Sequence, residues 1–117
     1  MEFPTPFDVK ANVHDGLGVV AVVGELDCAT APRLSEALAE MAEPGRVILV
    51  DLSDTEFMDC AGLAPLVAAC EHQRELGGDL ILDAPTRAVS RVIECTHLDN
   101  VLTVASGPKT ASSRESS

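Results

Sequence analysis

The hydrophobic pattern begins with two segments that are typical of β-strands. Apolar and polar side chains alternate over residues 7–13, which is the period of a half-buried strand. Asp15 and Gly16 then suit a tight turn, and residues 19–23 form a continuous apolar run. We therefore expect a β-hairpin with a more buried second strand, followed by a loop over residues 24–29.

Three later segments show the hydrophobic period of amphipathic helices. Residues 34–41, 63–70 and 89–96 carry mainly apolar side chains at positions i, i+3, i+4 and i+7, so one face of each helix is apolar. A residue that can cap a helix precedes each segment, in chain order Thr30, Asp59 and Thr86. The sequence thus predicts three amphipathic helices.

Pro65 interrupts the start of the second predicted helix. A proline inside a helix removes one backbone hydrogen bond and crowds the preceding turn. We expect either that regular helix begins only near Ala64 or that the segment is locally distorted. Both outcomes predict a loosened stretch from Asp59 to Ala64.

Short apolar runs alternate with these helices. Residues 47–50, 80–82 and 101–104 are rich in aliphatic side chains and suit central or edge strands. The chain order is then strand, strand, helix, strand, helix, strand, helix, strand, which indicates a layered α/β fold. Because strand-helix-strand crossovers are right-handed, we expect a mixed β-sheet of about five strands with three helices packed on one face.

Length and composition point to a single small domain. The chain has 117 residues, of which 46% are hydrophobic, enough for one domain with its own core. Only 3% are aromatic, so the core must be aliphatic. We expect an N-terminal extension over residues 1–6, a folded domain over residues 7–105, and a disordered tail rich in Ser and Thr over residues 106–117.

Charge and hydropathy argue against several classes of partner. The net charge is −11, and an acidic surface repels both nucleic acid and anionic membranes. No apolar run approaches the ~18 residues of a membrane span, and the first residues lack the features of a signal peptide. We expect a cytoplasmic protein that binds neither nucleic acid nor membrane, with its cysteines reduced.

The segment from Asp51 to Leu63 is the strongest candidate for a working surface. It joins the most buried predicted strand to the second helix, at the carboxyl end of the sheet, where ligands bind in open α/β folds. Asp59 is a suitable N-cap, which leaves the N–H groups of the next residues directed outward. From spacing alone, a capped helix start with small residues for close packing explains the same pattern.

Five short motifs stand in a fixed order along the chain. They are Gly24-Glu25-Leu26-Asp27, Thr30-Ala31-Pro32, Asp51-Leu52-Ser53, Phe57-Met58-Asp59-x-x-Gly62-Leu63 and Gly77-Gly78. Together they resemble the STAS domain family, of the anti-sigma factor antagonist type, and the likeness covers roughly residues 7–104. The resemblance implies a mixed sheet flanked by helices, and a regulatory protein that is not an enzyme and holds no cofactor.

The resemblance also implies a partner. STAS antagonists bind an anti-sigma factor, usually a serine kinase with the histidine-kinase-like ATPase fold, and so release a sigma factor for transcription. The alternative is a STAS subunit of another assembly, such as a stressosome or a lipid-transport ATPase complex, and a homodimer stays open. The docking residues that the resemblance implies are Gly24, Glu25, Asp27, Cys28, Thr30, Asp59, Cys60, Ala61, Gly62 and Leu63.

The chain departs from the family at the phosphorylation site. The family's kinase phosphorylates a Ser or Thr directly after the aspartate, where this chain has Cys60 after Asp59. A thiol is no substrate for that kinase. We therefore expect the usual off-switch, which adds roughly −1.5 to −2 charges, to be absent.

Two hypotheses account for Cys60. A thiol at a helix N-terminus is activated by the free N–H groups, although the carboxylate of Asp59 opposes a second anion. Cys28 lies in the other docking segment, so Cys28 and Cys60 form a candidate redox pair if their Cα atoms come within ~7 Å. In the alternative, Cys60 is a small side chain that cannot be phosphorylated.

Catalysis and metal binding find little support. A Cys60 nucleophile would need a histidine base within hydrogen-bond reach, and His72 lies twelve residues further along the same predicted helix. The three histidines have no spacing typical of metal ligands, and the chain lacks a G-x-x-x-x-G-K phosphate loop. We expect no enzyme activity and no metal site.

Overall fold

The computed structural model describes residues 6–105, and its framework is a five-stranded sheet in the order β1-β2-β3-β4-β5. β1 is antiparallel to β2, whereas the other neighbouring strands are parallel. The predicted extension over residues 1–6 and tail over 106–117 lie outside the described residues, apart from Pro6. The strands are β1 (Asp8–His14), β2 (Leu17–Leu26), β3 (Val47–Met58), β4 (Asp79–Asp83) and β5 (Thr103–Val104).

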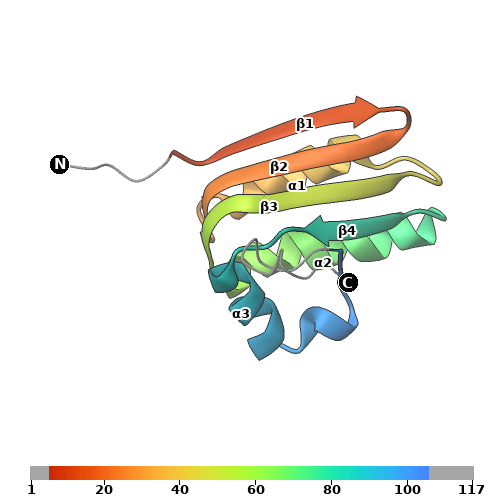
Figure 1. Ribbon diagram of the computed structural model, residues 1–117. Coiled ribbons are helices and arrows are strands. Elements are labelled where there is room, and N and C mark those ends of the chain that lie inside the picture. The colour runs from red at the N-terminus through yellow and green to blue at the C-terminus, as the bar shows by residue number, and fades with distance from the viewer. Residues whose placement is uncertain (1–5, 106–117) are drawn as a thin grey trace, which may run out of the picture.

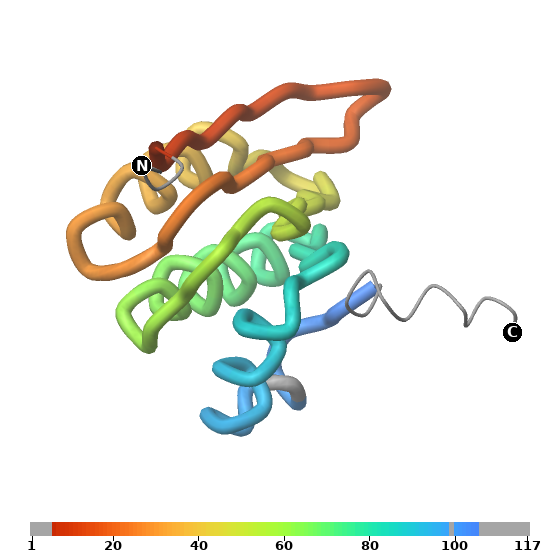
Figure 2. Tube along the Cα trace, turned by 60° about the vertical axis from the view of Figure 1, so that its left-hand side comes forward, coloured from red at the N-terminus to blue at the C-terminus, as the bar shows by residue number. Residues whose placement is uncertain are grey.

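Three α-helices and one short 3₁₀-helix complete the fold. They are α1 (Ala31–Met41), α2 (Cys60–Glu75), α3 (Arg87–Cys95) and η1 (Leu98–Asn100). α1 and α2 lie side by side behind the sheet in the view of Figure 1, and α3 lies on the far side of α2 from α1 (Figures 1 and 2). The predicted fold class, a mixed sheet of about five strands with three helices, is confirmed. Within residues 6–105, no helix is both long and apolar enough to cross a membrane.

The core lies between the sheet and the helices. In β2, in β4 and in β3 as far as Leu52, every second residue is buried, while the alternate positions are half-buried or exposed. All the buried side chains of the described core are aliphatic or sulfur-containing, as the low aromatic content predicts. Removing such side chains from water stabilises the fold by about 1.5–3 kcal/mol each.

Two strands are longer than the sequence pattern predicts. β2 continues to Leu26 and β3 to Met58, so the loop expected over residues 24–29 and the connection expected after residue 50 are partly strand. The parallel ladder between the two strands continues through two register shifts. The hydroxyl of fully buried Thr55 donates a hydrogen bond to the Val22 carbonyl at 2.8 Å.

β1 contributes to the core only near its beginning. Phe7 and Val9 pack partly buried against the core, whereas Val13, at the hairpin end, is 46% exposed. The half-buried strand predicted over residues 7–13 is therefore buried at one end only.

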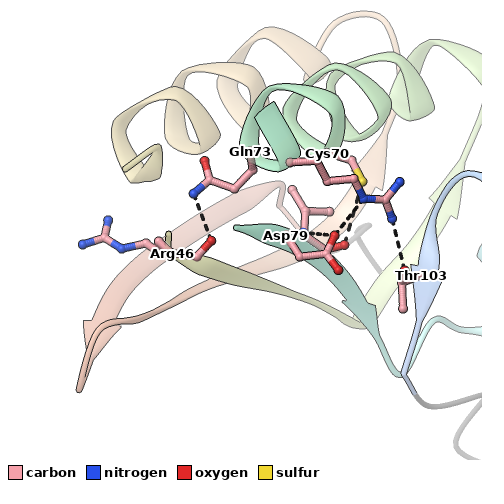
Figure 3. Close-up of polar contacts among 7 residues, drawn as sticks. Arg46, Cys70, Gln73, Asp79 and Thr103 are labelled. Atoms are coloured by element: carbon pink, nitrogen blue, oxygen red, sulfur yellow. Dashed lines mark hydrogen bonds and ion pairs between the residues drawn. The ribbon is translucent and has the colours of Figure 1, made fainter. Parts of the chain in front are cut away.

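A buried polar contact ties the end of α2 to the start of β3. The side-chain Nε2 of Gln73, a fully buried residue, donates to the carbonyl of Glu43 at 2.6 Å. It also donates to the carbonyl of Arg46 at 3.0 Å (Figure 3). Gly78 lies so close to this strand that an added Cβ would be 1.9 Å from the Arg46 carbonyl oxygen. The end of α2 is thus held by direct backbone contact.

A second contact at the same end of the molecule joins α2 to the strands beyond β3. Arg74 forms an ion pair with Asp79 at 2.9 Å and donates to the Thr103 hydroxyl at 3.2 Å (Figure 3). These three residues belong to α2, β4 and β5, so one exposed guanidinium links three elements.

Candidate partner-binding site

The first turn of α2 packs directly on the end of β2. The Asp59 N–H donates to the Leu26 carbonyl at 3.2 Å. Gly62 is buried at this contact, because an added Cβ would lie 2.8 Å from both Cγ and the carbonyl oxygen of Leu26 and 3.0 Å from Cγ of Met58. The absence of a side chain at residue 62 therefore lets the end of β2 and the start of α2 form one continuous surface, which we call the carboxyl edge (residues 24–30 and 54–63).

The turn from β2 into α1 is held by reciprocal side-chain hydrogen bonds. The carboxylate of Asp27 accepts from the N–H groups of Ala29 at 3.0 Å and Thr30 at 3.1 Å. The Thr30 hydroxyl accepts from the Asp27 N–H at 2.9 Å and donates to the Glu25 carbonyl at 2.9 Å. Thr30 is the N-cap residue of α1, as predicted, but its side chain makes no capping hydrogen bond, because its hydroxyl turns back toward β2.

The start of α2 is regular in spite of Pro65. α2 begins at Cys60, and the N-cap is Asp59, whose carboxylate accepts from the Gly62 N–H at 3.2 Å, as predicted. Of the two expected outcomes, a helix that begins only near Ala64 is wrong, and the loosening of the stretch from Asp59 to Ala64 stays a prediction. Pro65 has no N–H to donate to the carbonyl of Ala61, four residues earlier. The helix therefore lacks one backbone hydrogen bond in its first turns, while the cap at Asp59 stays intact.

The predicted docking residues divide by exposure into three groups: exposed, half-buried and buried. The exposed members can touch a partner, and the buried ones shape the surface from beneath. Glu25, Cys28 and Cys60 are exposed; Asp27, Thr30, Asp59 and Ala61 are half-buried; Gly24, Gly62 and Leu63 are buried.

The carboxyl edge is strongly acidic. Residues 24–30 contain two carboxylates and residues 54–63 contain three, with no Lys or Arg in either segment. Among the residues that the structure describes, no cluster of His, Cys, Asp and Glu could hold a metal ion. Acidic charge without a metal-binding geometry suits a basic macromolecular surface.

The cysteines of the carboxyl edge face different grooves. Cys28 lines a groove between α1 and α2 together with Ala31 and Ala61, whereas Cys60 lines a groove between α2 and η1 together with Leu98. Both thiols are free and exposed. The redox pairing of Cys28 with Cys60 stays a prediction.

Cys70, further along α2, contrasts with these two thiols. It is fully buried, and burial raises the pKa of its thiol above the ordinary value. The thiols of α2 therefore differ in access to solvent, with the accessible one at the carboxyl edge.

Phe57 also belongs to the carboxyl edge, although the motif analysis gives it no docking role. It is 47% exposed and lies beside Glu25 in the β2–β3 ladder. Sequence alternation could not reveal this, because the ladder changes register between Thr55 and Phe57.

The chain is similar to known proteins in both sequence and fold. The STAS domain family model matches residues 8–114. The anti-sigma-B factor antagonist of Bacillus subtilis is 32% identical over 98 residues, which are 84% of this chain and 88% of the relative. The anti-sigma-F factor antagonist RsfB of Mycobacterium tuberculosis is 36% identical over 72 residues, which are 61% of this chain and 59% of the relative.

Solved structures agree with these relatives. An anti-sigma factor antagonist from Mycobacterium paratuberculosis superposes with a TM-score of 0.76 at 32% identity, covering 89% of each chain. The motifs, the strand order and the family match over residues 8–114 all lead to one conclusion: this chain belongs to the STAS domain family.

Proposed function

We propose that this protein is an anti-sigma factor antagonist, which binds an anti-sigma factor stoichiometrically and thereby releases a sigma factor in the cytoplasm. One observation carries the proposal. Two segments that are distant in sequence, residues 24–30 and 54–63, meet at one exposed, acidic edge with no metal-binding cluster among the described residues. Relatives that are over 30% identical across most of both chains bear the same functional name.

The docking surface proposed here is the carboxyl edge. Glu25, Cys28 and Cys60 are exposed and are the side chains available for contact with the partner. The hydrogen bonds of Asp27 and Thr30 hold the turn rigid before binding, which lowers the entropy that association costs. Binding, rather than chemistry on a substrate, is the activity that such a preformed surface supports.

We further propose that the partner is of the serine-kinase type and that this chain escapes its phosphorylation at residue 60. Cys60 is the first residue of α2, directly after the capping aspartate, and it is exposed. A phosphate there would add negative charge to an edge that is already acidic. With a thiol in that place, the complex persists in the presence of ATP.

Charge reversal at the edge tests this function. The wild-type chain is mixed with each serine-kinase-type anti-sigma factor of its own genome, and affinity is measured by titration calorimetry. Glu25→Lys is expected to weaken binding by about tenfold or more, because it places a cation on the acidic edge. Glu40→Lys makes the same charge change near the other end of α1, also at an exposed residue, and is expected to have little effect.

The same experiment distinguishes the alternative assembly. If the immobilised chain retains transporter ATPase or stressosome subunits and binds no anti-sigma factor, the alternative function is correct and the proposed one is wrong. If Glu25→Lys and Glu40→Lys bind the anti-sigma factor with equal affinity, the docking surface does not lie at the carboxyl edge.

A further inference from the structure

We infer that Phe57 is the apolar anchor of the carboxyl edge, and that the partner receives it in an apolar pocket bordered by Lys or Arg side chains. The inference rests on the proposed function and adds a residue and a partner chemistry to it. Phe57 is 47% exposed, although it is one of only three phenylalanines in the chain.

A register shift in the sheet brings Phe57 to the surface. Thr55 lies opposite Gly24, and the next pairs are Phe57 with Glu25 and Met58 with Leu26. β3 therefore advances by two residues while β2 advances by one, which is the count of a β-bulge.

The bulge decides which of two neighbouring side chains is buried. Thr55 is fully buried, so regular alternation would direct residue 57 to the same buried face. With the extra residue, Met58 enters the core at 1% exposure and the Phe57 ring stays outside. Bulges commonly re-aim a side chain beside a functional site, and here the redirected side chain is the aromatic one.

The surroundings of Phe57 define the partner's chemistry. Glu25 is its neighbour in the ladder, Asp59 follows two residues later, and the segments 24–30 and 54–63 contain no cation. An aromatic ring that projects among carboxylates fits a desolvated apolar pocket with a basic rim. A few anchor residues that fill well-packed, desolvated pockets carry most of the binding energy in many interfaces.

Val13 provides a matched comparison inside the same molecule. It is 46% exposed, almost the same fraction as Phe57, but it lies in the β1–β2 hairpin at the opposite end of the sheet. Its sequence neighbours are Asn12 and His14, neither of which is acidic. Solitary exposed aliphatic residues of this kind are normal on protein surfaces, so Val13 serves as the control.

Alanine and leucine substitutions test the anchor. Affinities of the wild type, Phe57→Ala, Phe57→Leu and Val13→Ala are measured against the serine-kinase-type anti-sigma factor that the wild type binds. Phe57→Ala is expected to bind about 30-fold more weakly or worse, the effect typical of a buried anchor. Phe57→Leu keeps an apolar side chain and loses less, and Val13→Ala stays within about twofold of the wild type. Urea unfolding of each variant separates affinity from folding.

Two outcomes distinguish a failure of the Phe57 inference from a failure of the proposed function. If Phe57→Ala binds as tightly as the wild type while Glu25→Lys is weakened, the anchor is wrong and the proposed function stands. If the wild type binds none of the anti-sigma factors, both are overturned.

Discussion

The two ends of α2 are built in different ways. At its beginning, α2 meets β2 through one backbone hydrogen bond from Asp59 and the close packing of Gly62, and its exposed residue is the small Cys60. At its end, buried Gln73 and the tightly packed Gly78 join the helix to the start of β3. The helix is thus held by buried polar contacts at its end, whereas its beginning presents an exposed side chain to solvent.

We therefore expect the end of α2 to contribute mainly to stability and its beginning mainly to binding. At the anchored end the buried Nε2 of Gln73 finds its acceptors inside the protein, and a buried group that loses its partner costs free energy. At the carboxyl edge the side chains of Glu25, Cys28 and Cys60 are exposed, and substitution of exposed side chains usually changes stability by less than about 0.5 kcal/mol. Substitutions at the two ends should therefore separate into those that unfold the protein and those that affect only binding.

Gly78→Ala should have the largest effect on stability. The new Cβ would fall 1.9 Å from the Arg46 carbonyl oxygen, and backbone on both sides must move to relieve the overlap. We expect a loss of about 3 kcal/mol in the free energy of unfolding, measured by urea denaturation. Gly77→Ala is the control, because its Cβ meets no atom within 4 Å and only its positive φ costs about 1 kcal/mol. Similar losses for the two variants would contradict the close contact at Gly78.

Gln73→Met should rank second. Methionine keeps the volume of the side chain but cannot donate to the Glu43 and Arg46 carbonyls, which the glutamine reaches at 2.6 and 3.0 Å. We expect a loss of about 2 kcal/mol in urea denaturation, with affinity for the anti-sigma factor unchanged under folding conditions. An unchanged midpoint would show that these contacts do not anchor the helix.

Asp59→Ala should have a smaller effect on stability and a clear effect on binding. The variant removes the N-cap acceptor for the Gly62 N–H and one charge from the carboxyl edge. We expect a loss of about 1 kcal/mol in thermal unfolding, accompanied by weaker binding to the partner. Asp59→Asn is the matched control, since it keeps a side-chain acceptor for the Gly62 N–H and removes only the charge, so it should weaken binding with little loss of stability.

Cys60→Ala should change stability least. The side chain is exposed and makes no hydrogen bond that holds the fold among those described. We expect a change below about 0.5 kcal/mol in the free energy of unfolding. A larger loss would mean that residue 60 is part of the anchored structure rather than of the open edge.

The sequence predicts much of this arrangement, and particular residues show where prediction ends. Asp59 as N-cap and the buried aliphatic stripe of α2 follow from local chemistry, which acts over a few residues. The extension of β3 to Met58 does not, because it depends on pairing with β2, more than twenty residues earlier. The exposure of Phe57 depends on a register shift in that pairing, and the role of Gln73 depends on carbonyls that only the folded chain brings near.

The same limit applies to the carboxyl edge. The motifs identify its residues through family resemblance, but the packing of Gly62 on Leu26 is a fact of three dimensions. At Thr30 the local signal gives the position but not the contact. The residue stands at the start of α1, yet its hydroxyl bonds to the preceding turn and does not cap the helix. Local signals therefore locate the edge, and tertiary contacts decide what each residue does there.

A hydroxyl introduced at residue 60 tests whether the thiol there protects the complex from phosphorylation. Wild type and Cys60→Ser are each incubated with the serine-kinase-type anti-sigma factor and Mg-ATP, and the complexes are followed by intact mass and by co-elution. We expect the wild type to stay bound without a phosphoryl group, and Cys60→Ser to gain one phosphoryl group at residue 60 and to be released. A phosphorylated wild type, or a Cys60→Ser variant that is neither modified nor released, would contradict this expectation.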